Sequence, residues 1–331
     1  MNVELRDCLR RFPRLTITVW GDFVADEFVA GEIARVSREA PVLILKRRRR
    51  EVAAGGAGNA AANLAALGVR VRLVGAVGAD EPGQRLREIF AAWGMDTSRL
   101  MTLPGRPTPT KTRILAHHTH TAPQQVVRLD LEPDGLEAGG QARLERAAGA
   151  AARGSDAVLI SDYGYGAATP AGARRLHQRL GEARPVTVDA RYQIGEYRGM
   201  AAATPNEAEL EAAQRERILD RSGLERAGRR LRERLQCRHL LVTRGRDGMA
   251  LFEPGRRTRY LAIHGSDQAL DVTGAGDTVI AVFTAALAAG ADGWSAATLA
   301  NCAGGVVVMK RGTATLTPAE LEAELPRKAE G

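Results

Sequence analysis

The sequence predicts an α/β protein with a mostly parallel central sheet that is covered by helices on both faces. From about residue 140 onward, short apolar runs alternate with helical patterns, and such alternation is typical of right-handed βαβ units. The 331 residues are enough for one large core. Hydrophobic residues make up 44% of the chain and charged residues 26%, as in ordinary globular proteins. We therefore expect a single domain over residues 1–331, with ligands at the carboxyl ends of the strands.

The first third of the chain is expected to begin the sheet and to add strands outside it. Residues 15–20 are a β-rich run that ends at Gly21-Asp22, which predicts a core strand opening on a site-facing loop. Residues 27–51 alternate apolar and polar side chains, which predicts antiparallel strands that form a lid. Residues 108–131, with extended runs at 110–116 and 125–131, are expected to complete it. The other predicted elements of this third are a helix at 55–67, a strand at 69–77 and a helix at 82–93.

The remaining elements alternate regularly, and no repeat or long linker interrupts them. The predicted helices cover 142–152, 171–181, 206–213, 224–235 and the small-residue runs on either side of Gly290. The predicted strands cover 157–161, 185–189, 239–243 and an antiparallel pair at 248–252 and 259–263. Residues 327–331 are expected to fray.

Composition excludes several classes of protein. The net charge of +8 suits anionic small molecules as well as nucleic acid, but aromatic residues are only 4% and do not alternate with basic ones. That pattern argues against stacking on bases, so we expect no nucleic-acid partner. No apolar run could cross a bilayer and no signal peptide is apparent, which predicts a cytoplasmic protein without a membrane partner. Cys8, Cys237 and Cys302 are too few and too far apart for a disulfide framework.

The most informative segment runs from Asp271 through Thr273-Gly274-Ala275-Gly276 to Asp277, where a loop turns into an apolar helix. Glycines at such a turn let backbone N–H groups approach an anion from the positive end of a helix. Asp277 falls in the first helical turn, where a carboxylate could take a proton from a hydroxyl. A simple helix cap is the alternative interpretation.

This D-x-T-G-A-G-D pattern resembles the C-terminal signature of the ribokinase-like, or PfkB, family of sugar kinases. The resemblance implies a three-layer sandwich with a small β-strand lid. It also implies ATP and Mg²⁺ as cofactors, an anion hole at Gly274, Ala275 and Gly276, and Asp277 as the catalytic base.

A second segment, Gly55-Gly56-Ala57-Gly58-Asn59, resembles the G-G-x-x-N element of the same family. By resemblance, Gly55, Gly56 and Asn59 would contact a sugar, and Asp22 and Asp26 would bind further hydroxyls. A dinucleotide fingerprint starting at Gly56 is the alternative, but it needs an apolar strand upstream, and residues 46–51 are charged. No G-x-x-x-x-G-K-[ST] phosphate loop occurs in the sequence.

Other segments of the chain resemble the nucleotide and metal sites of the family. Asn206 and Glu209 follow Thr204-Pro205 as in the family's N-x-x-E element and are candidates for Mg²⁺ and phosphate, with a helix cap as the alternative. The residues expected around the nucleotide are Asn206, Thr243, Gly245, Gly248, Asp271, Asn301 and Gly312.

One branch of the family, the bacterial heptose-7-phosphate kinases, is similar over nearly the whole chain. The similar segments are residues 109–113, 124–132, 161–166 and 271–282. The resemblance implies D-glycero-D-manno-heptose 7-phosphate as substrate, phosphorylated at its anomeric hydroxyl. It places Lys111, Arg113, Arg128 and Asp162 in the substrate site. The chain departs from the branch where Tyr165 and Arg191 replace lysines.

Alternatives remain open at this level: a kinase for another sugar, a sugar-phosphate sensor with weak turnover, or a dinucleotide-dependent oxidoreductase. Two further features have simple interpretations. The basic run 46–50 is expected to be a solvated strand end, and His117, His118 and His120 a lid turn rather than a metal site. Packing of two lids against each other would make a homodimer.

Overall fold

The computed structural model describes residues 3–117, 124–265 and 269–326. Within these ranges, nine strands form a large sheet: β1 Thr16–Gly21, β4 Arg70–Gly78, β5 Asp96–Leu103, β8 Ala157–Asp162, β9 Val186–Ala190, β10 Ala202–Ala203, β11 His239–Thr243, β12 Met249–Phe252 and β13 Arg259–Leu261. Their order is β13-β12-β11-β10-β9-β8-β1-β4-β5. Neighbouring strands are parallel from β11 to β5, and only the pairings that involve β12 are antiparallel. The prediction of a mostly parallel sheet is confirmed.

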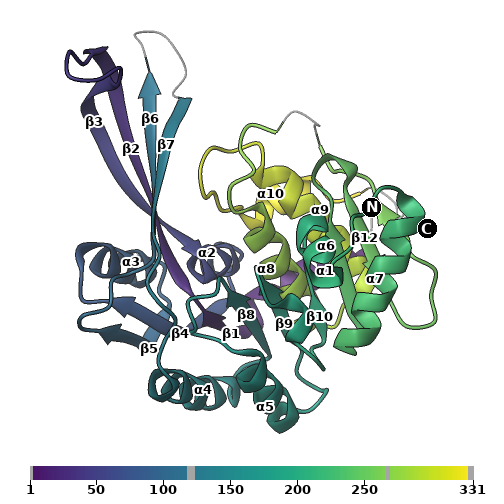
Figure 1. Ribbon diagram of the computed structural model, residues 1–331. Helices are drawn as coiled ribbons and strands as arrows, with labels where there is room; N and C mark the ends of the chain where they lie inside the picture. Colours follow the sequence, from purple (N-terminus) through teal and green to yellow (C-terminus); the bar gives the residue numbers. More distant parts are fainter. Residues whose placement is uncertain (1–2, 118–123, 266–268, 327–331) are drawn as a thin grey trace.

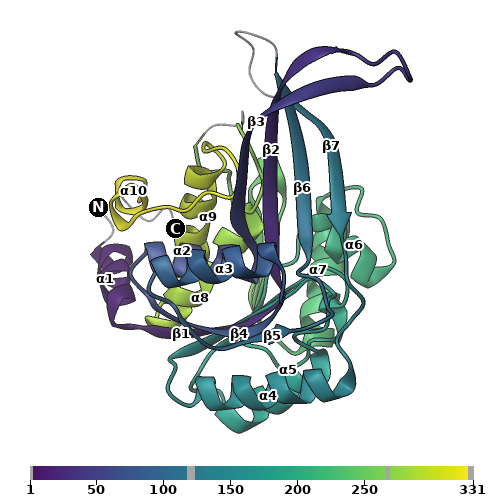
Figure 2. The ribbon, with the colours of Figure 1, turned by 90° about the vertical axis from the view of Figure 1, so that its left-hand side faces the viewer.

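Helices cover both faces of this sheet and complete three layers (Figures 1 and 2). One core cluster joins the sheet to α1 Val3–Arg11, α2 Ala57–Ala66, α3 Glu81–Ala92, α8 Ala275–Ala288, α9 Gly293–Val307 and α10 Pro318–Ala323. The other joins it to α4 Ala138–Ala152, α5 Pro170–Leu180, α6 Glu207–Gln214 and α7 Arg221–Leu235. Short 3₁₀ turns lie at Phe12–Arg14, Ile194–Glu196 and Gly245–Asp247.

A second, four-stranded sheet stands out from the body (Figure 2). It consists of β2 Phe23–Val36, β3 Leu43–Gly56, β6 Thr110–His117 and β7 Gln124–Leu131, in the order β3-β2-β6-β7. The β2/β3 pair is antiparallel, as expected, the β6/β7 pair is antiparallel too, and β2 runs parallel to β6. Because β2 starts directly after β1 and β3 ends at α2, this lid sheet is continuous with the core.

The basic run 46–50 lies inside β3, not at a strand end as predicted. The lid stands out from the body at this point (Figure 2), and the basic side chains are exposed on both faces of β3. Arg48 pairs with Glu32, and Arg50 with Glu27 and Glu81. Of the three lid histidines, His118 and His120 lie outside the described residues. Within the described ranges, no group of three or more His, Cys, Asp or Glu side chains could hold a metal ion.

Four elements had no counterpart in the sequence analysis: α1, β5, β10 and α10. The helices α1 and α10 lie near the chain ends, β5 is the outer strand of the sheet, and β10 has only two residues. β5, for example, mixes Asp96, Ser98 and Arg99 with apolar residues because it is the outer strand of the sheet. Among the described helices, none combines the length and the apolar character needed to span a bilayer.

The α8 helix provides a test of core stability. Phe283 on α8 has no exposed surface and packs edge-on against the ring of His239. Phe283→Ala should lower the free energy of unfolding by about 3–5 kcal/mol, because it removes buried area and leaves a cavity. Urea unfolding monitored by circular dichroism measures this loss. Leu219→Ala, at a side chain that is 88% exposed, should change stability by less than about 0.5 kcal/mol; equal effects would contradict the assignment of Phe283 to the core.

Candidate active site

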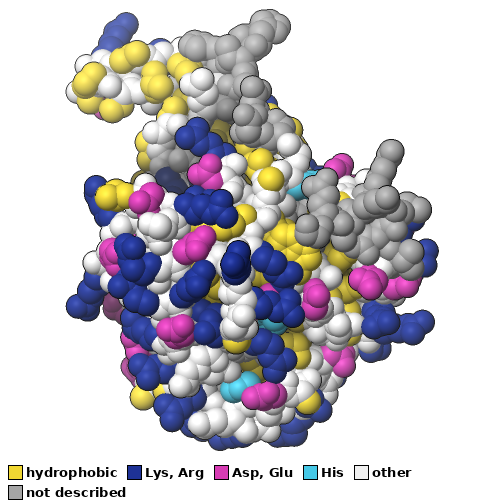
Figure 3. Space-filling view, turned by 90° about the vertical axis from the view of Figure 1, so that its right-hand side faces the viewer, with side chains coloured by type: hydrophobic (Ala, Val, Ile, Leu, Met, Phe, Trp, Pro, Cys, Tyr) yellow, Lys and Arg dark blue, Asp and Glu magenta, His cyan; other side chains and the backbone are white. Residues whose placement is uncertain are grey.

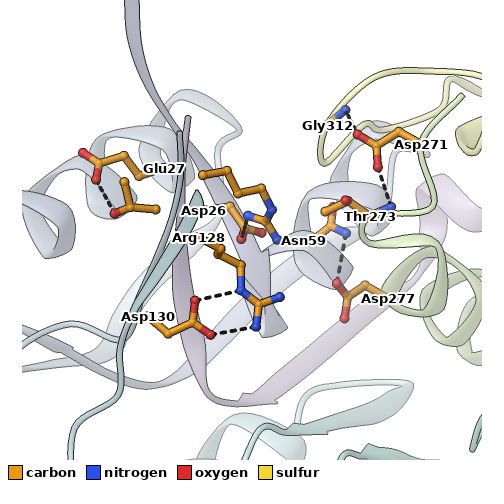
Figure 4. Close-up of polar contacts among 11 residues, drawn as sticks. Asp26, Glu27, Asn59, Arg128, Asp130, Asp271, Thr273, Asp277 and Gly312 are labelled. Atoms are coloured by element: carbon orange, nitrogen blue, oxygen red, sulfur yellow. Dashed lines mark hydrogen bonds and ion pairs between the residues drawn. The ribbon is translucent and has the colours of Figure 1, made fainter. Parts of the chain in front are cut away.

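Asp277 lies in the first turn of α8 and is only 4% exposed. Its Oδ1 accepts a hydrogen bond from the Tyr163 hydroxyl at 3.0 Å, and its Oδ2 accepts one from the Asn59 amide at 3.0 Å (Figure 4 shows the second). Burial raises the pKa of Asp277 to about 7, although both hydrogen bonds act to lower it. A carboxyl group with a pKa near neutrality is suited to exchange protons with a substrate.

The turn before Asp277 forms an open anion cradle. Gly274 caps α8 with φ 77°, a left-handed conformation that favours glycine. The N–H groups of this turn lie at the positive end of the helix. That of Ala275 donates to the Val272 carbonyl at 3.2 Å, which corrects the expectation that all three residues of the turn donate to a phosphate. A Cβ built at Gly276 would meet no atom within 4 Å. The space beside these N–H groups can therefore admit a phosphate.

Asn59 connects this turn to α2. Its amide donates to the Gly274 carbonyl at 3.1 Å as well as to Asp277, and its Oδ1 accepts a hydrogen bond from Asn63 at 3.1 Å. The sequence analysis expected Asn59 to contact the sugar, but here its amide orients the Asp277 carboxylate. The preceding Gly56 has φ 56°, and a Cβ there would lie 2.8 Å from a backbone oxygen. Glycine is therefore needed for β3 to meet α2 at this point.

Asp22 supports a loop instead of facing an open cleft. Its carboxylate is 3% exposed and accepts backbone N–H groups of Tyr163, Tyr165 and Ala167 at 2.9–3.0 Å. Burial, and then the nearby Asp162, raise the pKa of Asp22 to about 6. This geometry corrects the expectation that Asp22 binds sugar hydroxyls directly, because its oxygens are occupied by the loop that carries Tyr163.

Asp162 has a similar supporting position at the end of β8. It is buried and accepts hydrogen bonds from the Gly164 N–H at 2.8 Å and from the Tyr197 hydroxyl at 2.7 Å. Burial raises the pKa of Asp162 even though both hydrogen bonds lower it. The expected sugar contact is again replaced by a contact that fixes the 163–167 loop.

The lid face turned toward Asp277 carries the predicted basic residues. Across the lid strands, Lys111 pairs with Asp26 and with Asp130, and Arg113 pairs with Arg128. Directly opposite residues share a face of the sheet, so all five lie on one side. Two of the cations are engaged. Arg113 pairs with Asp26 at 2.5 Å, and Arg128 donates to both oxygens of Asp130 at 2.9 and 3.0 Å (Figure 4 shows this second pair).

Lys111 occupies a different environment on the same face. Its ammonium lies 5.2 Å from the centre of the Tyr163 ring. Burial, followed by the neighbouring Arg191, lowers the pKa of Lys111, and Asp26 and Asp130 oppose that effect. Lys111 and Arg191 therefore form a basic pair close to Tyr163.

A pocket of about 390 Å³ adjoins the anion cradle at Ala275 and Gly276. Four residues that were expected to bind a nucleotide line it: Thr243, Gly245, Gly248 and Asn301. Its walls are mostly small or apolar, as a flat heterocycle requires.

Asp271 and Gly312 do not line this pocket, contrary to expectation; they border a separate space of about 980 Å³ between the lid and the 270–273 loop. Asp271 accepts the N–H groups of Thr273 and Gly312, both at 2.9 Å (Figure 4). Burial acts to raise its pKa, but these hydrogen bonds hold the pKa below its usual value. Asp271 thus fastens the motif loop to the segment after α9.

Asn206 and Glu209 form a reciprocal capping box at the start of α6. The Asn206 N–H donates to Glu209 at 2.9 Å, and the Glu209 N–H donates to Asn206 at 2.8 Å. Nearby, burial together with the charges of Glu209 and Asp277 raises the pKa of Asp189 well above its usual range. The alternative interpretation, that Asn206 and Glu209 cap a helix, therefore holds. The Asp189 and Glu209 carboxylates could in addition accept Mg²⁺ through its water shell.

The sequence analysis missed Tyr163 and Asp189 as site residues. Tyr163 directly follows β8, and Asp189 is the next-to-last residue of β9. Both therefore lie at the carboxyl ends of parallel strands, where ligands bind. That position was the available signal for them.

A further cavity, of about 860 Å³, lies at the amino ends of β9 to β11 and contains none of these residues. Two of its arginines are paired, Arg238 with Glu182 and Arg256 with Glu253.

Lys and Arg side chains also gather on the side of the molecule that carries α7 (Figure 3). On α7 itself, Arg226 and Arg230 pair with Glu216. Much of the positive charge thus belongs to solvated ion pairs.

Solved structures with similar folds come from sugar and sugar-phosphate kinases. Ribokinase from Arabidopsis thaliana, described as complexed with ribose and ATP, superimposes with a TM-score of 0.72 at 19% identity, covering 94% of this chain and 98% of that one. Phosphofructokinase-2 from Escherichia coli gives a TM-score of 0.76 at 15% identity over the same shares. These likenesses define a ribokinase-like fold.

Residues 23–320 match the pfkB family of carbohydrate kinases, and the chain belongs to this family. As such it is a phosphotransferase that uses an alcohol group as acceptor. Curated relatives include the bifunctional protein HldE of Nitrosococcus oceani, 40% identical over 97% of this chain, and that of Halorhodospira halophila, 42% identical over 95%. The chain spans less than two thirds of their length, 66% and 64%.

Proposed function

We propose that this chain is an ATP- and Mg²⁺-dependent kinase that phosphorylates the anomeric hydroxyl of D-glycero-D-manno-heptose 7-phosphate. The observation that carries the proposal is the position of Asp277. It lies beside the open cradle at Gly276, between a nucleotide-sized pocket on one side and the basic lid face on the other. The similarity to HldE proteins supports the choice of heptose.

In this mechanism Asp277 takes the proton of the sugar hydroxyl as the hydroxyl oxygen attacks the γ-phosphorus of ATP. The bond between the γ-phosphorus and the β,γ-bridging oxygen breaks, and ADP leaves. The N–H groups of Gly274 and Gly276 would stabilise the negative charge of the transferred phosphoryl group. The pocket lined by Thr243 and Asn301 would hold the nucleotide base. Asn206, Glu209 and Asp189 would hold Mg²⁺, and the ion would neutralise phosphate charge.

The basic pair Lys111 and Arg191 would hold the phosphate that the sugar already carries. Arg113 is held by Asp26, and Arg128 by Asp130, so these two are less available. In the 161–166 loop, the Tyr165 hydroxyl donates to Glu132 at 3.0 Å and supplies no ammonium. The positive charge that Tyr165 lacks would then be supplied by Arg191, because a guanidinium suits a phosphate.

We also propose that the lid mediates a homodimer in the cytoplasm, where ATP is supplied. On the side of the lid away from Asp277, Val127, Leu129 and Leu131 of β7 are 46–57% exposed. Exposed apolar side chains on alternate positions of an edge strand favour burial against another molecule. A second lid would cover them and help to exclude water from the site.

The function is tested by ADP release from Mg-ATP with a set of sugars, each with and without a terminal phosphate. We expect turnover with heptose 7-phosphate and at least about tenfold lower kcat/KM without that phosphate, because a charge-assisted contact is lost. Equal turnover on the unphosphorylated sugar would contradict the substrate assignment. Absence of turnover on every sugar, with binding retained, would favour a sensor.

A variant sharpens this test. Lys111→Met should raise the KM for the sugar phosphate by about tenfold and leave the KM for ATP unchanged. Lys46→Met, at an exposed position of β3, serves as the matched control and should leave both unchanged. An unaltered KM in the Lys111 variant would remove this residue from the phosphate site.

A further inference from the structure

Tyr163 occupies a junction between the lid, the core and Asp277. Its hydroxyl donates to Asp277 Oδ1 at 3.0 Å, and Lys111 of β6 lies over its ring. Burial, and then the charge of Asp277, raise the pKa of Tyr163 well above its usual value. The phenol therefore stays protonated and keeps its role as donor.

The surroundings fix Tyr163 in this position. Its backbone N–H donates to the buried carboxylate of Asp22 at 2.9 Å. A Cβ at Gly56 would lie 3.2 Å from the Tyr163 ring, so the absence of a side chain there leaves room for it. Asp22 and Gly56 belong to segments that resemble sugar-binding elements. In the structure Asp22 holds the backbone of Tyr163, and Gly56 leaves room for its ring.

We propose that Tyr163 is a positioning residue that links the lid to the base: its hydroxyl orients Asp277 as a carboxylate, and its ring supports Lys111. This proposal rests on the function proposed above, with Asp277 as the base. It explains how binding of a substrate phosphate by Lys111 would act on the group that removes the proton. Tyr163 then connects phosphate recognition by Lys111 of the lid with proton removal by Asp277 of α8.

Several titratable groups lie near Asp277 and contribute to its titration. They are Asp26 from β2, Lys111 from β6, Asp189 from β9 and the Tyr163 hydroxyl from the loop after β8. Asp26 and Asp189 disfavour the carboxylate form, while Lys111 and Tyr163 favour it. Removing the Tyr163 hydroxyl should therefore raise the pKa of Asp277, and activity should require a higher pH.

The test is the pH dependence of kcat/KM in the full chain. The activity of the wild type should rise through pH about 7, the value for Asp277. Tyr163→Phe keeps the ring and should move this rise upward by about one pH unit. Tyr163→Leu should in addition raise the KM for the sugar phosphate by about threefold, because Lys111 loses its ring contact. Tyr165→Phe, on the same loop but bonded to Glu132, should not move the profile.

A Tyr163→Phe profile that superimposes on the wild type would overturn the proposal. If that variant does not fold, as judged by circular dichroism, 3-fluorotyrosine at position 163 replaces it. 3-Fluorotyrosine is nearly the same size as tyrosine, and its hydroxyl is a stronger donor. The rise of kcat/KM should therefore move to lower pH, and an unchanged profile would again overturn the proposal. Wild-type turnover in Asp277→Asn would instead reject Asp277 as the base, which is a separate failure of the proposed function.

Discussion

Asp277→Asn should lower kcat by about a thousandfold, within the range of 10²–10⁴ that a positioned general base contributes. The amide has nearly the same size as the carboxylate but cannot take a proton from the sugar hydroxyl. Because the anion cradle remains, KM for ATP should change little. Steady-state ADP release with saturating sugar phosphate measures the loss.

The matched control for this variant is Asp292→Asn. Asp292 is also a carboxylate at a helix N-terminus, where it caps α9 by accepting the Ser295 N–H at 2.7 Å. Asparagine caps helices about as well as aspartate, so this control should keep both stability and turnover. If the Asp277 variant retained more than about a tenth of wild-type kcat, the residue would not be the base.

Gly274→Val should reduce kcat by about a hundredfold or more, comparable to the loss of an oxyanion-hole donor. Its left-handed φ of 77° is unfavourable for valine, and a Cβ would lie 2.2 Å from the Asn59 amide nitrogen. The variant would therefore displace both the cradle and the side chain that orients Asp277. The loss should appear in kcat measured at saturating ATP and sugar phosphate.

Gly255→Val is the control for backbone strain. Gly255 has φ 67°, and a Cβ there meets nothing within 4 Å. Both variants should lose stability in urea unfolding through backbone strain, and Gly274→Val should lose more because of its contact with Asn59. Only Gly274→Val should lose activity. Equal activity in the two would show that the position of the cradle is unimportant for turnover.

Much of the fold could be read from local patterns. The apolar runs at β8, β9 and β11 and the intervening helices follow directly from their spacing, because central parallel strands are buried on both faces. The outer strand β5 could not be predicted in this way. Its side chains are only partly buried, so its pairing with β4 depends on contacts across the sheet and not on its own pattern.

The sequence by itself determined the glycine turn at Gly274 and the place of Asp277 in the first helical turn. It also led us to expect sugar, nucleotide and metal sites around them. These features are local, since a cap and the residues next to it lie within one turn of chain. Only the tertiary structure decided which side chains touch the Asp277 carboxylate. Asn59 and Tyr163 are separated from it by 218 and 114 positions. The partners of a buried polar group depend on how distant elements pack, and no spacing along the chain encodes that geometry.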